Sequence, residues 1–347
     1  MSEATASHRS AETDPREALL QIINSPMLAQ CLYVAAKLGI ADLLKDGPRS
    51  SDELAAATQV HARSLYRILR ALAGFGIFAE DEERRFALNP MAEPLRSDVP
   101  LSARGWTIMR GEDFMWQPWG QILHAVKTGE SAFVHVYGKD GWEYFAEHPE
   151  ASAIFDDAMR SISAQKFKAV AEAYDFSGVD TIVDVGGGNG GLMTSILTSN
   201  PHMTGVVAEL PHVVEGARKN IDAAGLSDRC SCVAIDMLEG VPDDVDAYIM
   251  ANVMQNFDDD CGVRVLRNCR RAMKEDGRVL VVECVIPGPN EAHLSKLADI
   301  EIFVMTDGGR ERTKQEYEAL YEAAELRLTK VVPTDSPWSI VEGVAAS

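Results

Sequence analysis

The sequence predicts an α/β fold, a parallel sheet covered by helices on both faces, preceded by a mainly helical winged-helix segment. A β-branched run from Thr181 leads through Asp184 into a cluster of glycines and then into an amphipathic stretch at 192–197. Apolar strand-like runs alternate with helical patterns from there to the end of the chain. Nearly continuous apolar strands of this kind are typical of a sheet buried on both faces.

The chain's 347 residues suffice for two domains, or for one large domain with an appendage. Its formal net charge of −20 argues against a nucleic-acid partner, because such a chain repels phosphate backbones. We expect no membrane partner, since no apolar run approaches the ~18 residues of a membrane span, and no signal peptide. The six cysteines form no C-x-x-C pair and the histidines no H-E-x-x-H motif. We therefore expect reduced thiols, a cytoplasmic location and no metal site.

Changes in composition divide the chain into four predicted parts. Residues 1–14 are polar and are predicted to be a disordered lead-in. A winged-helix domain is expected at 15–100, and a helical linker that carries a substrate pocket at 101–174. The cofactor-binding domain follows at 175–347.

The first part begins with a helical pattern at 16–44 that is apolar nearly all round, and Gly39 and the turn at 46–48 are expected to break it. Such a helix must be buried against its own chain or against a partner. Two more helices and a small hairpin, with strands at 76–80 and 85–89, complete a winged helix-turn-helix outline. Three arginines on one helix favour DNA binding, but the acidic net charge opposes it. We therefore expect a dimerisation scaffold.

The linker is rich in large side chains and holds four of the five tryptophans. These side chains can form a core between helices, or can hold a flat apolar ligand. The helix predicted next along the chain adds a methionine. The candidate substrate contacts are Trp106, Met109, Phe114, Trp116 and Met159.

The glycine cluster fits two cofactors. Gly186, Gly188 and Gly191 satisfy the dinucleotide pattern G-x-G-x-x-G, with Glu209 placed to hold a ribose hydroxyl. Gly186, Gly188 and Gly190 equally satisfy the G-x-G-x-G pattern of S-adenosylmethionine (SAM) enzymes. The glycines by themselves do not decide between the two.

Acidic residues follow several of the predicted strands. Ligands of parallel sheets bind beyond the carboxyl ends of the strands, so these acids are expected around one crevice. They are Asp184, Glu209, Asp236 and Glu283, joined there by the loop after Met250.

Four motifs together resemble the SAM-dependent O-methyltransferases of the plant caffeate type and their bacterial secondary-metabolite relatives. The resemblance covers nearly the whole chain and implies a Rossmann-like class I methyltransferase domain behind a winged-helix dimerisation domain. It also implies a homodimer and favours SAM over NAD. The motifs are DVGGGNG at 184–190, ELPHV at 209–213, DM at 236–237 and GGRERT at 308–313.

The same resemblance assigns cofactor contacts. It implies that Gly186 and Gly188 approach the amino-acid end of the cofactor and that Glu209, where the family usually has Asp, binds both ribose hydroxyls. Asp236 and Met237 are implied to bracket the adenine. The expected cofactor-binding residues are Asp184, Gly186, Gly188, Glu209, Asp236, Met237 and Ala251, the last in place of a lysine often found in the family.

The clearest departure from the family lies at Gln255-Asn256-Phe257, where the family usually has His-Asp-Trp. That histidine is the general base, and a glutamine amide is not basic near neutral pH. Two acids that flank the histidine in the plant enzymes are present as Glu283 and Glu311. Gln255, Glu283 and Glu311 are therefore the catalytic candidates. Asn256 resembles the anthracycline-modifying bacterial branch and is a further candidate substrate contact.

The sequence thus predicts a soluble, homodimeric SAM-dependent methyltransferase that acts on a small, mostly apolar, aromatic secondary metabolite. We expect O-methylation of an acidic hydroxyl without a histidine base. One alternative is C-methylation with Glu283 or Glu311 as base. The others are a SAM-dependent reaction that transfers no methyl group, and a catalytically inactive SAM-binding or regulatory protein.

Overall fold

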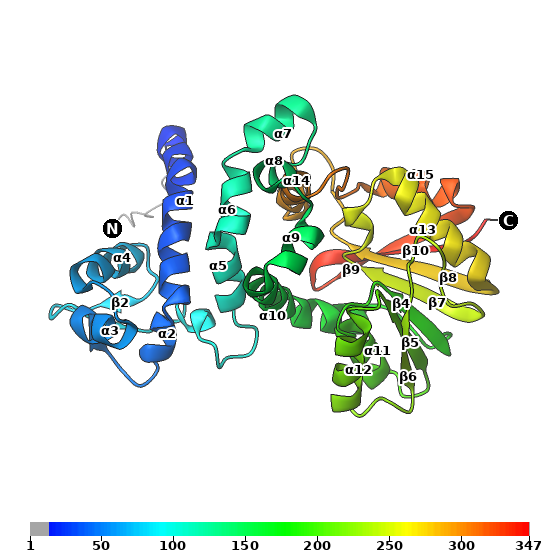
Figure 1. Ribbon diagram of the computed structural model, residues 1–347, viewed down its shortest axis with the longest axis horizontal. Coiled ribbons are helices and arrows are strands. Elements are labelled where there is room, and N and C mark those ends of the chain that lie inside the picture. The colour runs from blue at the N-terminus through cyan, green and yellow to red at the C-terminus, as the bar shows by residue number, and fades with distance from the viewer. Residues whose placement is uncertain (1–13, 347) are drawn as a thin grey trace, which may run out of the picture. The chain divides into compact units, whose positions relative to one another are not determined.

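A computed structural model describes residues 14–346 (Figure 1). The disordered lead-in predicted at 1–14 lies, except for its last residue, outside the described residues. The chain divides into two compact units, Met1–Glu112 and Asp113–Ser347. The four-part division expected from composition stays a prediction.

The first unit has the predicted winged-helix form. Ser50 and Glu53 make a reciprocal capping box at the start of the helix Ser51–Thr58, as a Ser-x-x-Glu sequence at a helix N-terminus favours. The predicted helix at 16–44 is broken at Gly39, whose φ of 65° lies in the left-handed region and cannot continue a helix. The elements are α1 (Pro15–Lys37), α2 (Ile40–Leu43), β1 (Arg49–Ser50), α3 (Ser51–Thr58), α4 (Ala62–Gly74), β2 (Ala79–Glu80), β3 (Arg85–Ala87), the 3₁₀ helix Glu93–Leu95 and α5 (Arg104–Gly111), with the strands in the order β1-β3-β2.

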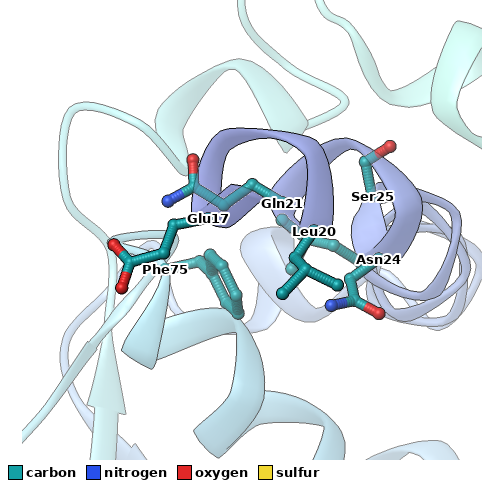
Figure 2. A pocket seen from close by; sticks show the side chains of 7 residues that line it. Glu17, Leu20, Gln21, Asn24, Ser25 and Phe75 are labelled. Atoms are coloured by element: carbon teal, nitrogen blue, oxygen red, sulfur yellow. The ribbon is translucent and has the colours of Figure 1, made fainter. Parts of the chain in front are cut away.

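Helix α1 exposes much of its apolar surface. A groove beside it is lined by Leu20, Leu28 and Phe75, together with polar side chains of the same helix (Figure 2). By length and composition alone α1 could also cross a membrane, so the expectation that no segment approaches that length is wrong. The expectation failed because residues 18–36 contain polar but no charged side chains. The polar residues interrupt the apolar run, but they lower the mean hydropathy of the segment only slightly.

The second unit is built on a seven-stranded sheet in the order β6-β5-β4-β7-β8-β10-β9. The first five strands are parallel, but β10 runs antiparallel to both β8 and β9, so the expectation of a wholly parallel sheet is wrong at this edge. Only Asp335 separates β9 from β10, and one residue cannot form the long crossover that parallel neighbours need. The strands are β4 (Thr181–Val185), β5 (Thr204–Glu209), β6 (Cys230–Ala234), β7 (Val245–Ala251), β8 (Met273–Glu283), β9 (Leu326–Thr334) and β10 (Ser336–Ala345).

Helices cover both faces of this sheet (Figure 1). Ile182 and Ile249 share one apolar cluster with side chains of α10 and α11, while Val183 and Val281 share the other with side chains of α13 and α15. The Rossmann-like class I architecture is thereby confirmed. The helices are α6 (Asp113–Trp119), α7 (Ile122–Thr128), α8 (Ala132–Tyr137), α9 (Gly141–Glu147), α10 (Pro149–Ala173), α11 (Gly191–Ser199), α12 (Val214–Ala223), α13 (Asp259–Ala272), α14 (Ser295–Met305) and α15 (Lys314–Ala323), with a 3₁₀ turn at Met254–Asn256.

Candidate active site

The turn between β4 and α11 needs glycine for two different reasons. Gly186 has a φ of 69°, and a Cβ there would lie 2.8 Å from the Cγ2 atom of Val253, so a larger residue would clash. Gly188 has a φ of 53°, and a Cβ there would meet nothing within 4 Å. The turn is therefore packed on its Val253 side and open at Gly188, where a ligand can lie against the backbone.

Asp184, at the end of β4, is a buried carboxylate that lacks a hydrogen-bond partner. Its side chain is only 1% exposed, and neither carboxylate oxygen bonds to any residue in the described part of the chain. Burial, and after it the nearby Glu209 carboxylate, raise the pKa of Asp184 to about 7. A buried polar group without a partner is unfavourable, so Asp184 is suited to a ligand that brings positive charge or donors.

Glu209 ends β5 and holds the glycine turn in place. Its two carboxylate oxygens accept backbone N–H bonds from Gly188 at 3.0 Å and from Leu210 at 2.7 Å. Each oxygen has a further lone pair available, so these two bonds leave it able to accept from ligand hydroxyls as well.

The loop after β6 carries the next two predicted residues. Asp236 is exposed and accepts a hydrogen bond from the backbone of Leu238 at 2.9 Å. The Met237 methyl group lies 3.1 Å from the position a Cβ on Gly186 would take, so its side chain reaches the glycine turn. The backbone oxygen of Met237 accepts from the Asn268 amide at 2.8 Å, which ties this loop to α13.

Gln255 lies between two buried carboxyl groups. With its amide nitrogen facing them, the orientation that satisfies both partners, Gln255 donates to Glu283 Oε2 at 2.7 Å and to Glu311 Oε1 at 3.0 Å. Glu283 Oε1 also accepts the backbone N–H groups of Val253 at 3.0 Å and of Gln255 at 3.4 Å. The structure therefore brings the three predicted catalytic candidates into direct contact.

The two carboxyl groups differ in their surroundings. Burial raises the pKa of Glu311 strongly, with the Glu283 carboxylate as the next cause, and Glu311 Oε2 has no partner among the described residues. Burial also raises the pKa of Glu283, but Lys166 and the two backbone N–H donors oppose that rise. Glu311 is therefore the carboxyl that keeps its proton to higher pH, and Glu283 is the one that ionises first.

Two residues without an assigned role in the sequence analysis support this region. Arg312, in the GGRERT motif, is completely buried and donates to the backbone oxygens of Met254 and Phe257, both at 2.9 Å, and to Asp259. It thereby holds the turn that carries Gln255. Lys166, on α10, is buried beside the strand ends. Its place on an otherwise apolar helical stripe with Ile162 and Val170 was a signal that sequence reasoning could have used.

Ala251 stands where the family often has a lysine. It is half-buried at the end of β7 and packs against the same apolar cluster as Phe167 and Trp338. Asn256, the candidate substrate contact in the loop that follows, turns its amide nitrogen to the backbone oxygens of Asn252 at 2.9 Å and of Val253 at 3.4 Å. In this structure the Asn256 amide braces its own loop.

The other candidate substrate contacts are divided between the two units. Trp106 and Met109 lie on α5 in the first unit. Phe114 is buried on α6 and packs edge-on against Phe145, with ring centroids 5.4 Å apart, whereas Trp116 on the same helix is 40% exposed. Met159 is half-buried on α10. The assignment of these side chains to a substrate stays a prediction.

Two domain models of the O-methyltransferases match this chain. The sequence model of the O-methyltransferase dimerisation domain matches residues 20–98, and that of the O-methyltransferase domain matches residues 119–327. The phenazine O-methyltransferase PhzM of Lysobacter antibioticus is 41% identical over 97% of this chain and 98% of that protein. The mitomycin biosynthesis 6-O-methyltransferase of Streptomyces lavendulae is 36% identical over 97% of this chain and 96% of its own. The phenazine-1-carboxylate N-methyltransferase of Pseudomonas aeruginosa is 35% identical over 86% of this chain and 88% of its own.

Solved structures also match this chain over nearly its whole length. The crystal structure of LaPhzM matches with a TM-score of 0.90 and 41% identity, over 96% of this chain and 100% of that one. CalO1, a methyltransferase of calicheamicin biosynthesis, was solved with S-adenosylhomocysteine (SAH) bound. It matches with a TM-score of 0.84 and 37% identity, over 96% of this chain and 100% of the CalO1 chain.

Proposed function

This chain belongs to the O-methyltransferase family and is a SAM-dependent methyltransferase, and we propose that it methylates an acidic hydroxyl of a small, mostly apolar, aromatic metabolite without a base of its own. The observation that carries the proposal is the contact of the Gln255 amide with Glu283 and Glu311. That contact puts a group that cannot accept a proton where the family usually has its histidine.

The residues at the strand ends fit the cofactor. The unpartnered Asp184 carboxylate suits the positively charged ammonium group at the amino-acid end of SAM, and the open side of the turn at Gly188 leaves room for it. Glu209 would accept from the ribose hydroxyls while it keeps its two backbone bonds. Asp236 and Met237 would bracket the adenine, and Ala251 would form part of the floor beneath the cofactor.

SAM supplies a methyl group that is already activated by its sulfonium, so the chain mainly has to position the acceptor and exclude water. A general base typically contributes about 10²–10⁴-fold to such a rate. Glu311 holds its own proton because burial raises its pKa, and Glu283 is already the acceptor of three N–H bonds. The acceptor hydroxyl must therefore lose its proton before the methyl group moves, which an acidic phenol does near neutral pH.

A nitrogen acceptor is the second candidate, favoured by one observation: the relative from Pseudomonas aeruginosa is named an N-methyltransferase at 35% identity. A nitrogen lone pair also needs no base. C-methylation would require Glu283 or Glu311 to take a carbon-bound proton. Glu311 already holds a proton near neutral pH because burial raises its pKa to about 9, and the Glu283 carboxylate already accepts three N–H bonds.

We further propose that the substrate contacts are drawn from Trp106, Met109, Phe114, Trp116, Met159 and Asn256. The homodimer would form through the exposed face of α1, which lies largely within the matched dimerisation region at 20–98. The protein would act in the cytoplasm, which subcellular fractionation tests.

The direct test is incubation with methyl-labelled SAM and a graded acceptor panel. The panel holds phenols of decreasing acidity, including a hydroxyphenazine, together with amine and carbon-acid analogues of the same ring systems. We expect a methyl ether and S-adenosylhomocysteine in equal amounts, with turnover that falls as the phenol becomes less acidic. An N-methyl or C-methyl product from the matched analogues, with no ether, would refute O-methylation.

A further inference from the structure

Lys166 is a buried cation with no direct polar partner. Its side chain is 2% exposed, and within the described residues it makes no hydrogen bond and no ion pair. Its ammonium nitrogen lies over two aromatic rings instead, 5.0 Å from the ring centre of Trp338 and 5.5 Å from that of Phe167. Aromatic faces attract a cation but do not replace the hydrogen bonds it had in water.

The position of Lys166 is close to the cofactor crevice. Burial lowers the pKa of Lys166, and the groups that act against this are Glu283, Cys284, Asp184 and Glu311, in decreasing order. These residues come from the ends of β4 and β8 and from the segment before α15. Two contacts place Lys166 at this edge of the sheet. The Trp338 indole beside its ammonium donates to Asn252 Oδ1, just after β7, at 3.0 Å. The Phe167 ring beside it lies 2.8 Å from where a Cβ on Gly191, the first residue of α11, would be, and parallel sheets bind their ligands at this edge.

The residue that ends β7 is small. Ala251 packs in the same apolar cluster as Phe167 and Trp338, the two rings that lie beside the Lys166 ammonium.

Asp184 presents the complementary problem, because it is a buried carboxylate whose two oxygens have no partner. The two unpartnered charges interact through space but do not form an ion pair with each other within the described residues. A ligand that carries both signs a few atoms apart would satisfy both. The amino-acid end of SAM has this chemistry, with an α-ammonium and an α-carboxylate on one carbon atom.

We propose that Lys166 binds the α-carboxylate of SAM while Asp184 binds its α-ammonium, so that the two residues form one recognition site for the zwitterion. This inference rests on the proposed function only in that SAM is the cofactor, and it makes no statement about the acceptor. It assigns Lys166 a role in cofactor selection and none in proton transfer.

The test compares SAM with decarboxylated SAM, which lacks only the α-carboxylate, by isothermal titration calorimetry. Decarboxylated SAM carries one more net positive charge, so a crevice lined by acids would bind it more tightly if Lys166 had no role. We expect the wild-type protein to bind SAM at least about tenfold more tightly than decarboxylated SAM, as loss of a charge-assisted hydrogen bond implies. Equal or tighter binding of decarboxylated SAM by the wild-type protein would overturn the proposal without any variant.

Three variants sharpen the result. Lys166→Met should lose about tenfold or more in SAM affinity and should no longer prefer SAM over decarboxylated SAM, whereas Lys166→Arg should keep that preference. The control is Lys168→Met, because Lys168 is exposed on the same helix and pairs with Glu172. It should bind both ligands as the wild-type protein does.

Two outcomes contradict the inference. If Lys166→Met weakens both ligands equally, Lys166 has a structural role, and a lower melting temperature would accompany this result. If Lys166→Met binds both ligands normally but shifts the pH–rate profile, Lys166 acts on a proton. Failure of the proposed function looks different, because SAM would still bind with its carboxylate preference while no hydroxyl on the panel became methylated.

Discussion

Gln255 donates a side-chain hydrogen bond of 3.0 Å to Glu311, and the same amide nitrogen lies 2.7 Å from Glu283. A neutral group thus joins the turn after β7 to the end of β8 and to the segment before α15. An amide can satisfy two carboxyl groups by donating to both, but it cannot take a proton from a substrate.

The first prediction concerns these three residues. Gln255→Ala, Glu283→Gln and Glu311→Gln should each lower kcat by less than about tenfold, because none acts as general base. The wild-type kcat/KM should rise with pH until the acceptor phenol is ionised, and it should follow the pKa of the phenol when the substrate is changed. Steady-state kinetics across the phenol panel measures this.

The control is the SAM affinity of each variant, which separates a loss of chemistry from a loss of binding. A loss of two or more decades in kcat for either Glu→Gln variant, with unchanged SAM affinity, would establish a carboxylate base and end the base-free mechanism.

The second prediction links SAM binding to protons through Asp184. Its pKa is raised to about 7 in the folded protein, above the ordinary value of 3.8, so the folded chain binds a proton here that the unfolded chain has released. Between these values the free energy of unfolding contributed by Asp184 therefore falls as pH rises. A bound ammonium group would favour the ionised form, so SAM should bind with proton release near pH 7 and more tightly as pH rises towards that value.

Calorimetry in buffers of different ionisation enthalpy measures the released proton. Asp184→Asn, which has no proton to release, should bind SAM more weakly and lose the pH dependence below pH 7. If the Asp184→Asn protein still releases the wild-type number of protons when it binds SAM, a group other than Asp184 releases them.

The third prediction concerns Glu209. Glu209→Ala should weaken SAM binding by about 1.5–3 kcal/mol if the carboxylate bonds to the ribose, and it should also lower the melting temperature. The second effect follows because the variant leaves the N–H groups of Gly188 and Leu210 without their acceptor. Glu215→Ala is the matched control, since Glu215 is exposed and pairs only with Arg218 among the residues described. A Glu209→Ala protein with wild-type SAM affinity would remove Glu209 from the cofactor site.

The fourth prediction compares two arginines that share Asp259. Arg312→Met should lower the free energy of unfolding by about 3 kcal/mol, because it leaves the backbone oxygens of Met254 and Phe257 without a donor in the interior. Arg310→Met removes a solvent-exposed ion pair with the same carboxylate and should change stability by less than about 1 kcal/mol. Denaturant unfolding measures both, and equal effects of the two substitutions would contradict this account of Arg312.

The fifth prediction concerns the dimer. Leu19, Ile23 and Met27 lie one helical turn apart on α1 and are 58–66% exposed, which is unfavourable for a chain without a partner. Ile23→Glu combined with Met27→Glu should convert the dimer to monomers in sedimentation velocity at micromolar concentration, with helical content retained. Val60→Glu changes an exposed apolar residue outside α1 and should leave the dimer intact. A wild-type protein that sediments as a monomer would refute the proposed interface.

Features that depend on neighbouring residues could be predicted from the sequence alone. Alternation of apolar strands with helices predicted the Rossmann-like sheet, and the glycines predicted the turn after β4. The Ser-x-x-Glu sequence at Ser50 and Glu53 likewise favours the helix start that the structure shows. These features can be predicted because hydrophobic periodicity, turn chemistry and helix capping act over a few residues. The family motifs likewise predicted that the chain is an O-methyltransferase.

Which distant side chains meet depends on the packing of the whole fold. Glu283 and Glu311 lie 28 and 56 residues after Gln255 in the chain, yet the Gln255 amide contacts both carboxyl groups because the fold brings their segments to the same edge of the sheet. Burial of Lys166 and Arg312, and the unpartnered state of Asp184, are likewise set by packing from several elements. The pKa of a buried group depends on all the charges and dipoles around it in space, and local sequence patterns do not contain that arrangement.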